Sequence, residues 1–112
     1  MVDFRALALS LPDAVEKETW GHPTFRVRDK MFASMSTDAT YASVKSTLDE
    51  QRALTHMEPD TFSVPAYVGK HGWIGIDLER VDPDEARELV TEAWRMTAAK
   101  RAVKAFDVEN PV

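Results

Sequence analysis

The chain has 112 residues, which is enough for one hydrophobic core and too few for two domains. Its composition of 44% hydrophobic and 29% charged residues is typical of a globular protein, and the net charge of −5 disfavours general binding to phosphate polymers. The absence of cysteine excludes disulfides and thiolate chemistry, and neither a membrane-spanning apolar run nor a secretory signal pattern is present, so we expect one cytoplasmic domain over residues 1–112.

The first half of the chain predicts a helix followed by an antiparallel meander. Asp3 is a helix cap, and Phe4, Leu7 and Leu11 repeat at helical spacing. We expect strands over residues 14–20, 24–28, 31–35 and 40–45, with turns at 21–23, 29–30 and 37–39. Apolar and basic side chains alternate from residue 24 to residue 28, as in a strand with one buried face.

The second half predicts a short helix, two more strands and a long final helix. Thr47 and Glu50 form a capping-box pattern for a helix that ends near residue 55. Strands follow at 61–64 and 73–78, separated by a turn at 69–72. Asp82 and Pro83 begin the longest helix and Glu85 completes its capping box. Its buried stripe is Ala86, Leu89, Val90, Ala93 and Thr97, and its last turns carry Arg95, Lys100, Arg101 and Lys104.

These elements predict an α+β fold, in which the N- and C-terminal helices cover one face of an antiparallel sheet. Period-two alternation assigns the residues that face the helices: Phe25, Val27, Met31, Ala33, Met35, Ala42, Val44, Ile74 and Ile76. The opposite face then carries Arg26, Arg28, Phe32, Tyr41, Lys45 and Trp73. Glu16, Glu18 and Asp77 can share that face and reduce its positive charge.

Four segments of the chain resemble the YjbR/MmcQ-like family of small bacterial proteins. They are Leu11-Pro12, residues 20–27 with 30–33, residues 64–74, and residues 92–95 with 99–101. The resemblance implies a frataxin/CyaY-like α/β sandwich with a short helix in the middle. It also implies DNA binding, because the fold resembles a double-wing arrangement. The family's Lys-Arg-His-Trp pattern differs here, where the stretch is Lys70-His71-Gly72-Trp73.

Basic and aromatic residues together suggest one candidate function, the binding of DNA or another nucleic acid. In single-strand binding proteins, cations follow the phosphates and aromatic rings stack on bases. The candidate residues are Arg26, Arg28, Phe32, Tyr41, Lys45, Lys70 and Trp73. The alternative is that Arg and Lys stems simply cover the aromatic rings on an exposed sheet face.

A second candidate is a small-molecule or protein site in an aromatic pocket near the strand corners. Its residues would be Trp20, His22, Tyr67, His71 and Trp73. The stretch Trp20-Gly21-His22-Pro23 can also be a plain corner, because Gly supplies backbone freedom and Pro fixes the next dihedral angle.

Enzymatic and metal-dependent functions receive no support from the motifs. No nucleophile or phosphate-loop pattern occurs, so we name no catalytic residue and expect no enzyme. His22, His56 and His71 lack metal-ligand spacing, and the first helix carries only Asp3 where frataxins hold iron, so we expect neither metal nor cofactor. We expect a monomer that does not bind membranes.

Overall fold

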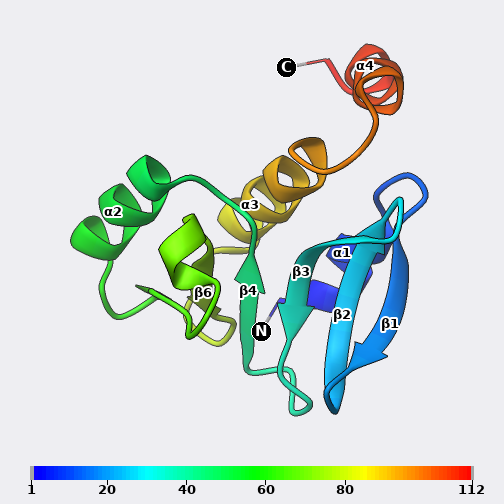
Figure 1. Ribbon diagram of the computed structural model, residues 1–112. Helices are drawn as coiled ribbons and strands as arrows, with labels where there is room; N and C mark the ends of the chain where they lie inside the picture. Colours follow the sequence, from blue (N-terminus) through cyan, green and yellow to red (C-terminus); the bar gives the residue numbers. More distant parts are fainter. Residues whose placement is uncertain (1, 112) are drawn as a thin grey trace.

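Six strands form one antiparallel sheet in the computed structural model, which describes residues 2–111. The strands are β1 (Val15–Thr19), β2 (His22–Val27), β3 (Lys30–Met35), β4 (Tyr41–Val44), β5 (Phe62–Ser63) and β6 (Ile74–Asp77). They lie in the order β1-β2-β3-β4-β6-β5, so β1 and β5 form the two edges (Figure 1). The meander and the antiparallel pairing predicted from the sequence are confirmed.

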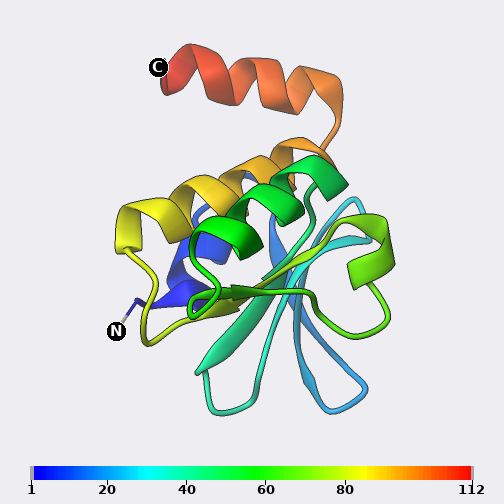
Figure 2. The same ribbon diagram turned by 90° about the vertical axis from the view of Figure 1, so that its left-hand side faces the viewer.

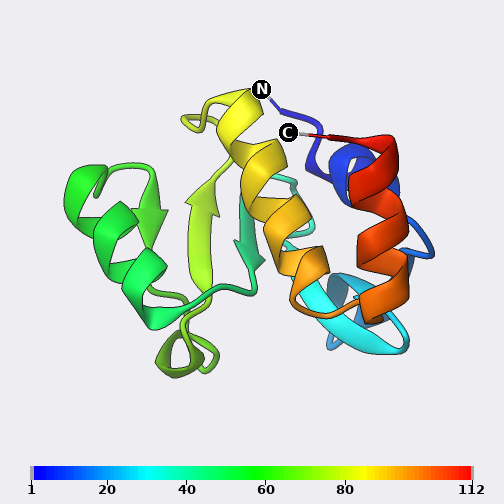
Figure 3. The same ribbon diagram turned by 90° about the horizontal axis from the view of Figure 1, so that it is seen from above.

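The helices lie mainly on one side of this sheet. The described residues form α1 (Phe4–Leu9), α2 (Leu48–Met57), α3 (Pro83–Arg95), α4 (Lys100–Glu109) and the single 3-10 turn η1 (Gly69–His71). Views from the side and from above place α1 and α3 on one side of the sheet and η1 on the other (Figures 2 and 3). The predicted α+β architecture, with terminal helices over one face, is therefore confirmed.

The core between sheet and helices is built by large side chains from distant parts of the chain. Phe4 of α1 meets Phe25 of β2 edge to face, with ring centroids 5.9 Å apart. Trp94 of α3 is fully buried, and its Nε1 donates a hydrogen bond to the carbonyl oxygen of Pro12 at 3.0 Å. Because a buried indole N–H needs an acceptor, this bond fixes the loop after α1 against α3. No helix formed by residues 2–111 has the length and apolar character required to cross a membrane.

The expectation of one long final helix is wrong, because that helix ends before its predicted basic turns. α3 stops at Arg95, and the extended backbone of Ala99 precedes a separate helix, α4. The break lets α4 fold back, so that Phe106 contacts Trp94 with ring centroids 5.1 Å apart. The basic residues Lys100 and Arg101 therefore begin α4 and do not end α3, so that Arg95 alone of the predicted basic residues lies in the last turn of α3.

A β-bulge in the β2–β3 pair reverses two of the predicted side-chain positions. Phe25 pairs with Ala33 but the next residue, Arg26, pairs with Met31, so β3 contains one extra residue at Phe32. Phe32 is completely buried among the core residues, whereas Met31 lies on the open face opposite the helices. Strict alternation had predicted the reverse for both.

The charged residues of β1 also differ from expectation. Glu16 pairs with Phe25 and therefore faces the helices, where its carboxylate binds the Arg5 guanidinium of α1 at 2.7 Å. Glu18 lies two residues further along β1, so its side chain also points away from the open face. Two of the three carboxylates that were expected to dilute the charge of the open face are thus absent from it. Asp77 is the third, and it lies opposite Tyr41.

Candidate ligand-binding site

Trp20 and Gly21 form the two-residue turn between β1 and β2. Their φ angles are 51° and 84°, and the strands pair directly on either side through Thr19 and His22. The predicted break at residues 21–23 is therefore wrong by two positions, since His22 and Pro23 already belong to β2. Tight hairpins favour positive φ at both turn residues, but they favour Asn or Gly there and not Trp. The Trp20 side chain is 94% exposed.

Tyr67 repeats this combination on the segment that precedes η1. Its φ is 63° and its side chain is 92% exposed. The left-handed conformation costs an L-residue roughly 1–2 kcal/mol. Neither side chain gains burial in return, so local packing does not explain why large aromatic residues occupy these two positions. Residues held in such conformations concentrate at ligand-binding sites.

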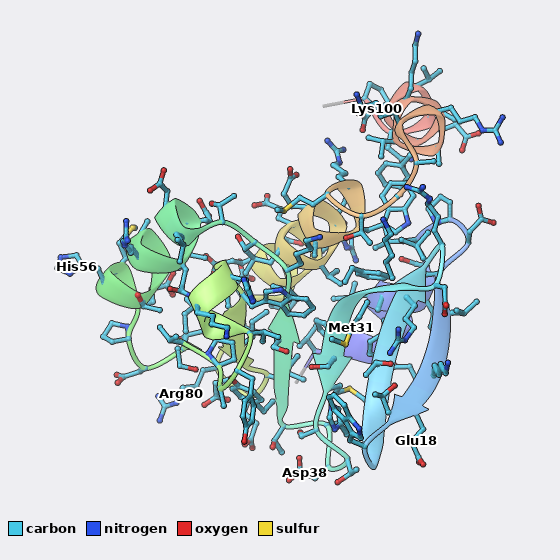
Figure 4. All side chains as sticks on the ribbon, in the orientation of Figure 1. Glu18, Met31, Asp38, His56, Arg80 and Lys100 are labelled. Atoms are coloured by element: carbon cyan, nitrogen blue, oxygen red, sulfur yellow. The ribbon has the colours of Figure 1, made fainter. Side chains whose placement is uncertain are left out.

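Trp20 and Tyr67 flank one cavity of about 650 Å³, which we call the aromatic hollow. It lies between the open face of β2, β3 and β4 and the segment 65–68. Its lining residues are Thr19, Trp20, His22, Thr24, Met31, Ser34, Tyr41, Ser43, Pro65, Ala66, Tyr67, Val68 and Trp73. Figure 4 labels Met31 on β3, within this open face. A mainly apolar cavity with a few polar groups has the usual make-up of a small-molecule site.

Hydroxyl groups from the sheet form the polar part of the hollow. Ser34 Oγ and Ser43 Oγ are hydrogen-bonded to one another at 2.6 Å across β3 and β4. Thr24 is completely buried, and its hydroxyl donates to the carbonyl oxygen of Lys17 at 2.6 Å. Because hydroxyls both donate and accept, such groups can orient a polar ligand without adding charge.

The Arg26 side chain lies directly beside the hollow. Its Nη2 donates to Thr19 Oγ1 at 3.2 Å and its Nε to Thr24 Oγ1 at 3.4 Å, and both hydroxyls line the cavity. Its Nη1 donates to the carbonyl oxygen of Asp29 at 3.3 Å. These three partners are two hydroxyls and a backbone carbonyl, so none of them is a carboxylate that would neutralise the guanidinium.

A buried glutamine holds the wall that carries Trp73. Gln51 of α2 donates from Nε2 to the carbonyl oxygens of Gly69, at 2.8 Å, and Trp73, at 2.6 Å. Gly72 has a φ of 93°, and a Cβ there would lie 2.6 Å from the carbonyl carbon of Thr47. Position 72 therefore has no room for the imidazole of the family pattern. The helix α2 and the segment 69–73 pack backbone to backbone as a result.

A second glycine allows Tyr41 to lie across the sheet. Any Cβ at Gly75 of β6 would collide with the Tyr41 hydroxyl and would lie 2.6 Å from Ser63 Oγ. Gly75 pairs with Ser43, so this space belongs to the open face that the hollow occupies. The bare backbone of β6 therefore determines where one aromatic wall of the hollow stands.

The structure brings together only part of the residues proposed from the sequence. Four of the pocket candidates, Trp20, His22, Tyr67 and Trp73, line the hollow, whereas His71 does not. Tyr41 and Trp73, two of the nucleic-acid candidates, line it as well. Trp73 is 7% exposed and presents only part of its ring to the cavity.

The remaining nucleic-acid candidates do not line the hollow. Phe32 is in the core and its predicted place on the open face is wrong. Arg28, with a φ of 56°, is an exposed turn residue between β2 and β3, where the turn had been expected one residue later. Lys45 follows β4, and its backbone N–H bonds to Phe32, while Lys70 is exposed on η1. The half-buried Arg26 lies beside the hollow, whose lining residues include neither Lys nor Arg.

Sequence reasoning missed Met31, Ser34, Ser43 and Pro65 as lining residues. The bulge hides the true position of Met31, as described above. Ser34 and Ser43 could have been found, because small hydroxyl residues on neighbouring strands, each flanked by apolar residues, indicate an open face that something else covers. Pro65 had been taken only as a sign that the predicted strand 61–64 ends there or lies at a sheet edge.

A different cavity, of about 510 Å³, lies between α2 and α3 and is strongly acidic. Its lining includes Glu50, Glu85, Glu88 and Glu92. Burial raises the pKa of the Glu85 carboxyl, and the neighbouring Glu58 raises it further. The residues from 2 to 111 contain no group of three or more His, Asp or Glu side chains placed to hold a metal ion. His56 lies on α2, far from the β1–β2 hairpin (Figure 4).

Comparisons with known proteins bear on the whole of this site. The YjbR family model matches residues 9–96, which include every residue that lines the aromatic hollow but not α4. The crystal structure of Deinococcus radiodurans protein DR2400, described as containing a DUF419 domain, has a similar fold with a TM-score of 0.77. That match covers 96% of this chain and 84% of the other at 21% sequence identity. No curated protein matches the chain.

Proposed function

The chain belongs to the YjbR family, and we propose that it is a non-enzymatic binding domain whose aromatic hollow holds a ring-bearing small molecule. The observation that supports this most directly is the pair Trp20 and Tyr67. Both are more than 90% exposed, both have positive φ, and both flank the same cavity. A planar ligand would bury these exposed rings by stacking on them, which contributes favourably to its binding.

The chemistry of the lining supports binding over catalysis. General acid–base catalysis needs a positioned acid or base together with a group that orients it. His22 lines the hollow, but the residues that line it include no carboxylate, lysine or arginine that could orient its imidazole. The hydroxyls of Ser34 and Ser43 bond to one another and not to a base. Such groups suit recognition of a ligand more than activation of a nucleophile.

Binding can be measured by ligand-observed NMR with a set of aromatic fragments and a matched set of ring-free fragments. We expect the aromatic fragments alone to bind, and Trp20→Ala or Tyr67→Ala to weaken them about tenfold, in line with the contribution of an aromatic contact. Met57→Ala removes a large, mostly exposed apolar side chain on α2 and is the control. Binding that survives both aromatic substitutions would refute the proposal.

A second candidate is single-stranded nucleic acid, which the family resemblance and the double-wing likeness suggest. The observation that favours it is the charge of Arg26, which no carboxylate neutralises among the described residues, beside exposed rings on which bases can stack. The frataxin-like relationship of the fold is part of the same hypothesis. The net charge of −5 weighs against it, as does the absence of Lys and Arg from the residues that line the hollow.

The two candidates differ in their response to salt. Each phosphate contact adds roughly −0.7 to −0.9 to the slope of log affinity against log salt concentration. Titration of a labelled oligonucleotide should therefore show a steep slope that Arg26→Met flattens, if nucleic acid is the ligand. Absence of oligonucleotide binding at low salt, together with binding of aromatic fragments, would leave the small-molecule proposal alone.

A further inference from the structure

We propose that the ligand of the aromatic hollow carries an anionic group beside its planar ring, and that Arg26 binds that group. This inference rests on the proposed function, because it specifies the chemistry of the molecule that the hollow holds. Its evidence comes from three features of the site: the charges that surround the hollow, the hydrogen bonds of Arg26, and the arrangement of the rings.

The surroundings of the hollow favour an anion over a cation. The chain has 19 acidic residues, yet none of the residues that line the hollow is Asp or Glu. Asp77 lies opposite Tyr41, but its carboxylate is occupied by Arg80 at 3.4 Å and by the backbone N–H of Glu79 at 2.9 Å. Lys17 pairs with Thr24 and shares the open face. A cationic ligand would therefore meet like charges and no counter-ion.

Hydrogen bonds hold Arg26 in one position. Thr24 has a single hydroxyl proton and donates it to the Lys17 carbonyl, so Thr24 accepts a hydrogen bond from Thr19 at 3.2 Å. Thr19 in turn accepts from Arg26 Nη2. This directed chain fixes the guanidinium against the wall of the hollow. The entropy of ordering a long side chain is then already lost before the ligand arrives.

Arg26 also retains hydrogen-bond donors for a ligand. A guanidinium has five N–H groups, and Arg26 uses one on Nε, one on Nη1 and one on Nη2. One N–H therefore remains on each terminal nitrogen. None of the ion pairs formed by the described residues involves Arg26. A half-buried guanidinium with two spare donors and only neutral partners is suited to bind a carboxylate or phosphate oxygen.

The exposed rings of the hollow favour a ligand that contains a planar ring beside its anionic group. Trp20 and Tyr67 contact no other aromatic ring among residues 2–111, so their faces are available for stacking. Trp20 directly follows Thr19, the residue to which Arg26 donates. A ring held at Trp20 thus brings an attached anionic group into the neighbourhood of Arg26. The geometry fits an aromatic or heteroaromatic acid of small size.

The test uses two probes with the same ring and opposite charge, 2-naphthoate and 2-naphthylmethylammonium, titrated calorimetrically at low salt and neutral pH. We expect the wild-type protein to bind naphthoate at least about tenfold more tightly, as a charge-assisted hydrogen bond allows. Arg26→Met should abolish this preference. Arg28→Met changes the net charge equally in an exposed turn and should retain it. The comparison of two probes on the wild type needs no variant, so it stands even if Arg26→Met does not fold.

The possible failures are distinguishable. If both probes bind equally and Trp20→Ala weakens the binding of both, the anion inference is wrong and the proposed function survives. A preference for naphthoate that persists in Arg26→Met also overturns the role of Arg26. If neither probe binds, both the inference and the proposed function are wrong.

Discussion

Trp20 combines a strained backbone with a side chain that is almost fully exposed. We therefore expect that Trp20 serves ligand binding and lowers the stability of the fold. The Trp20-Gly21 turn has positive φ at both positions, which Asn-Gly adopts with the least strain. Trp20→Asn should therefore raise the free energy of unfolding by about 1 kcal/mol. The same change should weaken the binding of aromatic fragments about tenfold, because it removes one aromatic contact. Denaturant unfolding and fragment titration measure the two effects, and a stability loss would show that Trp20 is there for the fold.

Gly72 and Gly21 both have positive φ, yet only one of them lacks space for a side chain. A Cβ at Gly21 meets nothing within 4 Å, whereas one at Gly72 lies 2.6 Å from the backbone of Thr47. We expect Gly21→Ala to cost about 1–2 kcal/mol, which is the backbone term alone. Gly72→Ala should cost clearly more, because α2 must also move. Equal losses in the free energy of unfolding, measured with urea, would mean that the segment 69–73 can shift away from α2 at no further cost.

At the scale of elements, α4 is the most weakly attached part of the structure. None of its residues is fully buried. Ala102 and Val103 pack partly against the core, Phe106 contacts Trp94, and Arg95 Nη2 binds Asp107 Oδ1 at 2.6 Å. Because few apolar contacts support it, we expect its amides to exchange with deuterium much faster than those of α3. Phe106→Ala should accelerate exchange in α4 and leave the strands unchanged. Matching protection in α3 and α4 would contradict this view.

The elements also show what the sequence alone can predict. The meander and the helix caps at Asp3 and Thr47 follow from local patterns, and both side chains make the expected cap bonds. Asp82 lies at the start of α3 but makes no such bond. The sequence pattern predicts the cap residue but does not determine the orientation of its side chain. The bulge at Phe32 depends on pairing between strands, which no single strand encodes. The lining residue Met31 was missed for the same reason, whereas Ser34 and Ser43 follow from alternation along their own strands.

At the scale of the whole molecule, charges are segregated between the two faces. Carboxylates gather in the groove between α2 and α3, while the aromatic hollow on the other side is free of them. The net charge of −5 therefore says little about the surface beside Arg26. A sequence total cannot reveal this separation, because it depends on which face each strand presents.

This segregation has a consequence for stability against pH. Burial, with help from Glu58, raises the pKa of Glu85 above its usual 4.5. The folded state then binds the Glu85 proton more tightly than the unfolded state does, so this group gains stability as the pH falls through its folded pKa and costs stability at neutral pH. Glu85→Gln should raise the melting temperature at pH 7, and the difference from wild type should shrink as the pH approaches 4.5. A constant difference across that range would exclude the linkage.

β1 forms an uncovered edge of the sheet, and its residues disfavour pairing of that edge with a second copy of the chain. An exposed strand edge offers free backbone groups to any second copy and can start runaway aggregation. Three consecutive charged residues, Glu16, Lys17 and Glu18, occupy the centre of β1. The opposite edge, β5, is only two residues long and provides little template. The protein can therefore keep its aromatic side chains exposed at high concentration without its chains joining edge to edge.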